Sequence, residues 1–243
     1  MLKFCGWRFK AVLSVLVGIL PVLVAALSGG CQVAHQDDPS PIAAIIQKLL
    51  PESSQQKRQK LMAKLGSPDA DLRREGVLML GEGEASGWQA TPEILSIMAL
   101  GDTEPQVRAA AVGVLVRIGE KERLPDVLAK ASQDNSALVR LESVAGLSGG
   151  GDDSSMNLLL NLLNRDMESE IRSRAAEALG NFPNRRAVQA LIAALDDDDF
   201  GVIYQAEQSL RKLTGQDFAD DAGRWNEWLI GMKDPFAQSG AKK

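Results

Sequence analysis

The sequence predicts an all-α protein: a right-handed α-solenoid of about five helix pairs with a capping helix at each end, preceded by an N-terminal targeting segment. Three observations carry this prediction. A motif returns at an interval of 32 residues, and the apolar residues within each copy fall at helical spacing. The apolar content is mainly Leu, Ala, Val and Ile, with only 5% aromatic residues, which suits close packing of helices.

The first 30 residues have the pattern of a secretory signal peptide. Three basic residues and no acidic one precede an uncharged apolar run over 11–27, and small residues then lead to Cys31. The run has about the minimum length for crossing a bilayer, and Pro21 interrupts it. We therefore expect 1–30 to direct export.

The end of this signal resembles the bacterial lipobox, in which the cysteine is acylated before cleavage. The usual box has Leu three residues before the cysteine, whereas here Ser28 stands there and Leu27 lies one residue further back. The resemblance implies a lipoprotein anchored to a membrane through lipidated Cys31. Gln32 favours the outer membrane, facing the periplasm, within the bacterial cell envelope. The alternatives are an uncleaved anchor and a soluble exported form.

The rest of the chain divides into a tether, a repeat domain and a tail. Residues 31–41 are polar and contain the single histidine, His35, so they read as a lipid-anchored tether. The repeat domain spans 42–231, and its first part, 42–65, is expected to cap the N-terminal end. A disordered tail is expected over 232–243.

Three segments of the repeat domain resemble one another most closely. They begin at Asp102, Asp134 and Asp166, and each has Val or Ile at five, Arg at six, Ala or Ser at nine and Leu at thirteen residues further on. We expect each Asp to be the N-cap of a first helix, whose apolar positions form one buried face. Leu147, at position thirteen of the middle copy, is therefore expected in the centre of the core.

Two looser copies flank these three. They begin at Ser67 and Asp197, and the last has Ile203 where the arginine is expected. After each first helix comes a break that contains glycine, and then a second apolar helix. The second helices are expected over 124–131, 155–164 and 187–195. Short helix pairs that bury apolar faces against their neighbours form an α-solenoid.

A closing helix is expected at the C-terminal end of the array. Thr214-Gly215 ends the preceding helix, and Asp220 or Asp221 caps the next one. Trp225, Trp228 and Leu229 then share one face, which we expect to pack on the last repeat.

The repeat motif resembles that of HEAT repeats, specifically the short variety named after phycobilisome lyases, over residues 67–213. The resemblance implies a structural ladder between the Asp and Arg residues of adjacent units. That ladder would comprise Asp102, Asp134, Asp166, Arg108, Arg140 and Arg172. The resemblance also implies that second helices line the concave side and offer their non-core positions to a protein partner. Those candidates are Asp126, Lys130, Asn157, Asn161 and Gln189.

Composition argues against several other classes of function. The net charge is −5, and becomes −8 without the three basic residues of the first 30, so nucleic acid is not an expected partner. The repeats contain neither His nor Cys, which excludes a Ser/His/Asp set and the paired His-Glu iron ligands of deoxyhypusine hydroxylase, a HEAT-repeat enzyme. The acidic run 196–199 lacks the spacing of a calcium loop. We expect no metal and no cofactor.

The sequence therefore predicts a non-catalytic, membrane-anchored scaffold for protein–protein interaction. The main alternative is a structural or assembly factor that has no single tight partner. An enzyme related to the phycobilin lyases is a more remote alternative.

Overall fold

The computed structural model describes residues 55–149, 151–232 and 236. They belong to a compact unit that spans 39–243. The predicted signal peptide, Cys31, the tether and residues 42–54 lie outside the described residues, as does most of the predicted tail. Within the described part, every regular element is a helix, so the chain is all-α.

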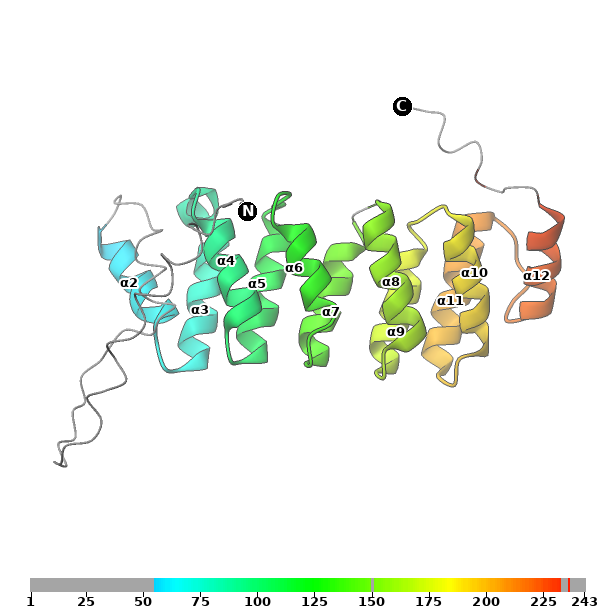
Figure 1. Ribbon diagram of the computed structural model, residues 1–243, viewed down its shortest axis with the longest axis horizontal. Helices are drawn as coiled ribbons and strands as arrows, with labels where there is room; N and C mark the ends of the chain where they lie inside the picture. The colour runs from blue at the N-terminus through cyan, green and yellow to red at the C-terminus, as the bar shows by residue number, and fades with distance from the viewer. Residues whose placement is uncertain (1–54, 150, 233–235, 237–243) are drawn as a thin grey trace, which may run out of the picture. The chain divides into compact units, whose positions relative to one another are not determined.

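The described helices form an α-solenoid in which two kinds of helix alternate (Figure 1). The first helices of the repeats are α3 (Ala70–Leu80), α5 (Pro105–Arg117), α7 (Ala137–Leu147), α9 (Ser169–Leu179) and α11 (Phe200–Thr214). The second helices are α4 (Thr91–Gly101), α6 (Leu124–Ala131), α8 (Asp153–Arg165) and α10 (Arg185–Ala193). Helix α2 (Gln55–Leu65) precedes this array and α12 (Ala222–Gly231) follows it. The short 3₁₀ helices are η1 (Gly83–Gly87) and η2 (Ala194–Asp196).

The core follows the motif positions. At position thirteen, Leu115, Leu147 and Leu179 are each at most 1% exposed, so the prediction for Leu147 is confirmed. The small residues at position nine, such as Ala111 and Ser143, are completely buried. Because these side chains are short, neighbouring first helices can approach closely.

The two rows of helices differ in how tightly they pack. Adjacent first helices are in contact along the whole row, whereas α6 and α8 of the second row make few contacts. Between α9 and α11 the approach is especially close, because a Cβ atom on Gly180 would lie 2.7 Å from Ser209 Oγ. The row of first helices is therefore the tighter of the two rows.

The motif aspartates do not cap the first helices, contrary to the sequence prediction. Asp102, Asp134 and Asp166 each lie three residues before the first helical residue. Each accepts a hydrogen bond from the backbone N–H two residues on, at 2.8–3.0 Å, which forms the turn that leads into the helix. In the last copy Asp199, not Asp197, caps α11 by accepting from the N–H groups of Gly201 and Val202.

Helix α12 closes the C-terminal end as the sequence predicts. Helix α11 ends at Gly215, whose φ of +69° is the left-handed conformation that favours glycine, and Asp221 caps α12. Trp225 is completely buried, and its Nε1 donates to the Ala219 carbonyl at 2.9 Å. Arg185 of α10 donates to the last carbonyls of α12, which ties this helix to the second row.

Candidate partner-binding surfaces

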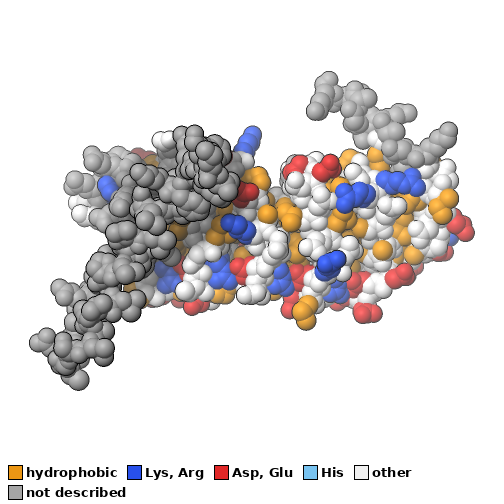
Figure 2. All heavy atoms as spheres, in the orientation of Figure 1, with side chains coloured by type: hydrophobic (Ala, Val, Ile, Leu, Met, Phe, Trp, Pro, Cys, Tyr) orange, Lys and Arg blue, Asp and Glu red, His pale blue; other side chains and the backbone are white. Residues whose placement is uncertain are grey.

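A ladder of arginines and aspartates runs along one edge of the stack. Each arginine donates from Nε and Nη2 to both carboxylate oxygens of the aspartate in the next repeat, at 2.7–2.8 Å. The pairs are Arg73–Asp102, Arg108–Asp134, Arg140–Asp166 and Arg172–Asp197. Figure 2 shows basic and acidic side chains interspersed along the lower edge of the stack, where the turns into the first helices lie.

The same arginines also hold the turns of their own repeats. Arg108 Nη1, for example, donates to the Asp102 carbonyl at 2.9 Å and to the Thr103 carbonyl at 3.2 Å. Each guanidinium therefore joins its own turn to the carboxylate of the next one. The ladder includes Arg73 and Asp197 in addition to the six residues named from the sequence, because the looser flanking copies supply its two ends.

The ladder is a structural feature, because its charges are satisfied internally. The hydrogen bonds from Arg172 hold the pKa of Asp197 below its usual value, although burial opposes this. For Asp134 and Asp166, burial is the largest single influence and raises the pKa. The hydrogen bonds from Arg108 and Arg140, the backbone hydrogen bonds and the positive charge of the neighbouring ladder arginines together outweigh it, so the net pKa is lowered. These residues offer little free hydrogen-bonding capacity to a partner.

The partner-binding residues expected from the sequence lie on the row of second helices. Asp126 and Lys130 are on α6, Asn157 and Asn161 on α8, and Gln189 on α10, and all five are exposed. The structure links Asn157 to α10, because Arg186 Nη2 donates to its Oδ1 at 2.8 Å. These side chains form a polar surface, and the groove described next lies on the first helices instead.

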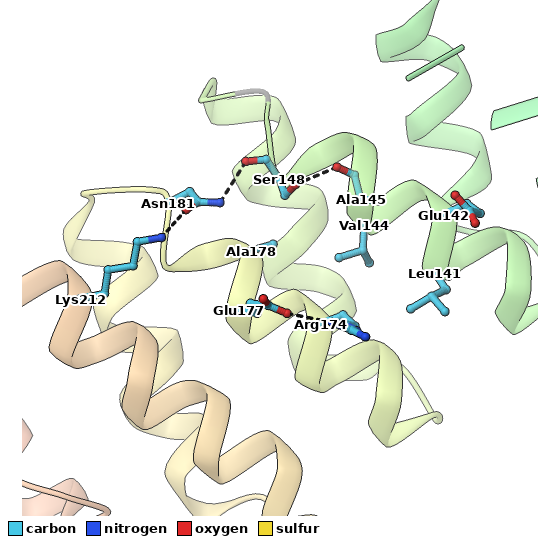
Figure 3. Close-up of a pocket in the computed structure, with 10 residues that line it drawn as sticks. All are labelled: Leu141, Glu142, Val144, Ala145, Ser148, Arg174, Glu177, Ala178, Asn181 and Lys212. Carbon is cyan, nitrogen blue, oxygen red and sulfur yellow. Dashed lines mark hydrogen bonds and ion pairs between the residues drawn. The ribbon is translucent and has the colours of Figure 1, made fainter. Parts of the chain in front are cut away.

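A groove lies between α7 and α9 on the row of first helices, and we call it the seam groove (Figure 3). Its volume is about 390 Å³, within the range of about 300–1,000 Å³ that is usual for ligand sites. Its apolar residues are Leu141, Val144, Ala145 and Ala178. Its polar residues are Glu142, Ser148, Arg174, Glu177, Asn181 and Lys212.

The polar residues of the seam groove are partly connected to one another. Arg174 and Glu177 form an exposed ion pair at 3.2 Å. At one end, Lys212 of α11 donates to Asn181 Oδ1 at 2.6 Å, and Asn181 Nδ2 donates to the Ser148 carbonyl at 3.3 Å (Figure 3). An apolar floor with hydrogen-bonding groups of both kinds at its rim suits a peptide segment of another protein.

The groove exists because the α7–α9 seam is filled by short side chains. Ala145 of α7 and Ala178 of α9 both line it, so neither helix fills the space between them. At the α9–α11 seam, by contrast, Ser209 Oγ donates across to the Ala176 carbonyl at 2.8 Å. Sequence reasoning missed every residue of the groove. The signal that could have pointed to it is the pair of short side chains, Ala145 and Ala178, on the first helices of adjacent copies.

No group of three or more His, Cys, Asp or Glu side chains in the described part of the chain is placed to hold a metal ion. Over the same residues, none of the helices combines the length and the apolar character needed to cross a membrane.

Comparison with known proteins identifies the repeats. A family model described as HEAT repeats matches residues 58–148 and 124–211, which together cover more than half of the chain. No curated protein matches the sequence.

Among solved structures, the chain is similar to one from "The structure of the complex of CpcE and CpcF of phycocyanin lyase from Nostoc sp. PCC7120". The two share 18% sequence identity with a TM-score of 0.54, over 75% of this chain and 73% of that one. At this identity the likeness shows the fold alone. The two matches to the HEAT-repeat model, the ladder and the stacked helix pairs lead to one conclusion: the chain belongs to the HEAT-repeat family.

Proposed function

We propose that this protein is a non-catalytic scaffold that binds a protein partner and is held at the bacterial cell envelope by lipidated Cys31. HEAT repeats are typical of proteins that form extended surfaces for other proteins. The envelope anchor rests on the sequence alone, namely the apolar run that ends in Ser28-Gly29-Gly30-Cys31.

The observation that carries the binding proposal is the seam groove. It places an apolar floor, with Val144 and Ala178 almost completely buried, beside an exposed rim of both charge signs. Partner anchors of this kind concentrate binding energy in a few buried contacts. Tethering both proteins to one membrane would raise the effective concentration and compensate for a small interface.

The test fills the seam groove with a larger side chain from one of its own lining residues. Ala145→Arg places a long side chain in it from an exposed helical position, where arginine is well tolerated. The matched control is Asn161→Arg, which adds the same side chain to the exposed surface of α8. The full-length chain is crosslinked in membranes and purified. We expect one stoichiometric partner with the unchanged chain and with the control, and its loss with Ala145→Arg at an unchanged melting temperature.

Other outcomes would favour a different binding site or a different function. Loss of the partner with Asn161→Arg and its retention with Ala145→Arg would move the site to the second helices. Recovery of many substoichiometric proteins, unaffected by either change, would favour the structural or assembly factor.

A further inference from the structure

Large apolar side chains stand exposed at the turns that lead into α9 and α11. Met167 is 92% exposed, Phe200 is 78% exposed and Tyr204 is 48% exposed. The fold does not require them. The residue that corresponds to Met167 is Thr103 in one other repeat and Asn135 in another. Phe200 likewise corresponds to Pro105, Ala137 and Ser169.

Met167 also lines a second groove, which we call the turn groove. It lies between the α8–α9 turn and the α10–α11 turn and has a volume of about 520 Å³. Met167 lines it from one turn, and Asp196 and Asp198 line it from the other. Phe200 follows two residues after Asp198, and Ser173 Oγ donates to the Gly201 carbonyl at 3.2 Å, which holds the start of α11 against α9.

The charge around the turn groove is acidic and largely unpaired. Its other two aspartates, Asp166 and Asp197, are neutralised by the ladder arginines. The remaining two acids of its lining, Asp196 and Asp198, are exposed and form no ion pair within the described residues. Two more exposed acids without an ion pair, Glu168 and Glu170, follow Met167 in the sequence. Arg165 is the one cation of the lining that is outside the ladder. The surface therefore favours a cationic ligand with an apolar part.

We propose that the turn groove binds a basic peptide segment of a partner protein that carries a large apolar side chain between Lys or Arg residues. The apolar side chain packs on Met167 and Phe200, and the basic side chains meet Asp196 and Asp198. An anionic lipid surface is disfavoured, because the same acids repel it. This site is separate from the seam groove and is expected to operate whether or not that groove binds a partner.

The experiment measures binding of a fluorescent peptide, Lys-Lys-Phe-Lys-Lys, to the full-length protein by anisotropy. We expect two double variants, Met167→Ser with Phe200→Ser and Asp196→Asn with Asp198→Asn, each to weaken binding by about tenfold. The matched control is Asp220→Asn with Glu227→Gln, which removes two exposed acids elsewhere and should leave the affinity unchanged. All the changed side chains are exposed, so the melting temperature should not move.

Three results would overturn the proposal. Equal weakening by the control pair would mean general attraction of a cation to an acidic protein. If the unchanged protein bound a peptide with Ala in place of Phe equally well, the apolar contact would not contribute to binding. Unchanged affinity in both groove variants would show that the peptide does not bind in the turn groove.

Discussion

At the scale of the residue, one arginine in each of the first four repeats binds both its own turn and the carboxylate of the next repeat, and so fixes the spacing between them. Arg140 illustrates this, with its side chain 16% exposed and that of its partner Asp166 only 3% exposed. Removing the arginine would leave a buried carboxylate and two turn carbonyls without their donors.

We therefore expect Arg140→Met, which keeps most of the length of the side chain, to lower the free energy of unfolding by about 3 kcal/mol. The measurement is chemical denaturation followed by circular dichroism. The matched control is Arg174→Met, because the Arg174–Glu177 pair is more than half exposed and should contribute less than about 0.5 kcal/mol. Similar losses from both substitutions would contradict a special role for the ladder.

The ladder also predicts a pH dependence of stability. Arg172 lowers the pKa of Asp197 in the folded state, so between the folded and unfolded pKa values the unfolded chain binds more protons. The stabilisation is present above the unfolded pKa of about 3.9 and is lost as the pH falls through the folded pKa. We expect Arg172→Met to reduce the change in unfolding free energy between about pH 5 and about pH 3, the range in which this carboxylate takes up its proton. Equal slopes in the two proteins would contradict this.

The sequence predicted the partners in the ladder but not the geometry of the turns. The interval of 32 residues places Arg108 and Asp134 in adjacent repeats, so their pairing follows once the family resemblance is accepted. An Asp before a helical pattern also looks like an N-cap, and the sequence alone cannot show that the helix begins three residues later. The donor that competes for that carboxylate is an arginine 26 residues away, which local reasoning does not consider.

At the scale of the element, each first helix depends on its buried face more than on its own helix propensity. Leu147 lies at the end of α7 with 1% of its surface exposed and has repeats on both sides. We expect Leu147→Ala to cost about 2–5 kcal/mol and to lower the melting temperature clearly.

The control for this prediction is on the same helix. Leu138 is 42% exposed, so Leu138→Ala loses little buried area and should leave the melting temperature nearly unchanged. A larger effect from Leu138→Ala than from Leu147→Ala would mean that α7 is oriented differently from the structure described above.

The seam groove and the tighter packing of the first helices could not be predicted from helical periodicity. Periodicity identifies which face of α7 or α9 is buried, but the width of a seam depends on pairs of residues from two different helices. Ala145 and Ala178 leave the α7–α9 seam open, whereas Gly180 lets α11 approach α9. Which residues of the two helices meet depends on how the helices pack, and helical periodicity does not give that packing.

At the scale of the whole molecule, the proposed anchor determines where the scaffold operates. We expect Cys31→Ser to abolish the incorporation of radiolabelled fatty acid and to leave the precursor uncleaved by the lipoprotein signal peptidase. The sulfur is the only atom of that side chain at which the acyl group can be attached, and Cys5 provides an internal control within the signal segment. Equal labelling of the Cys31→Ser protein, or no labelling of the unchanged protein, would contradict the lipoprotein assignment.

The identical junctions of the ladder have a consequence for how such a protein changes length in evolution. Arg108 meets Asp134, and Arg140 meets Asp166, through the same two hydrogen bonds at nearly the same distances. A gene that gained or lost one whole repeat would rejoin an arginine to an equivalent aspartate, so the new junction would need no compensating mutation. Natural selection could then lengthen or shorten the array in steps of one repeat, while the substitutions that distinguish one partner from another accumulate at positions outside the ladder.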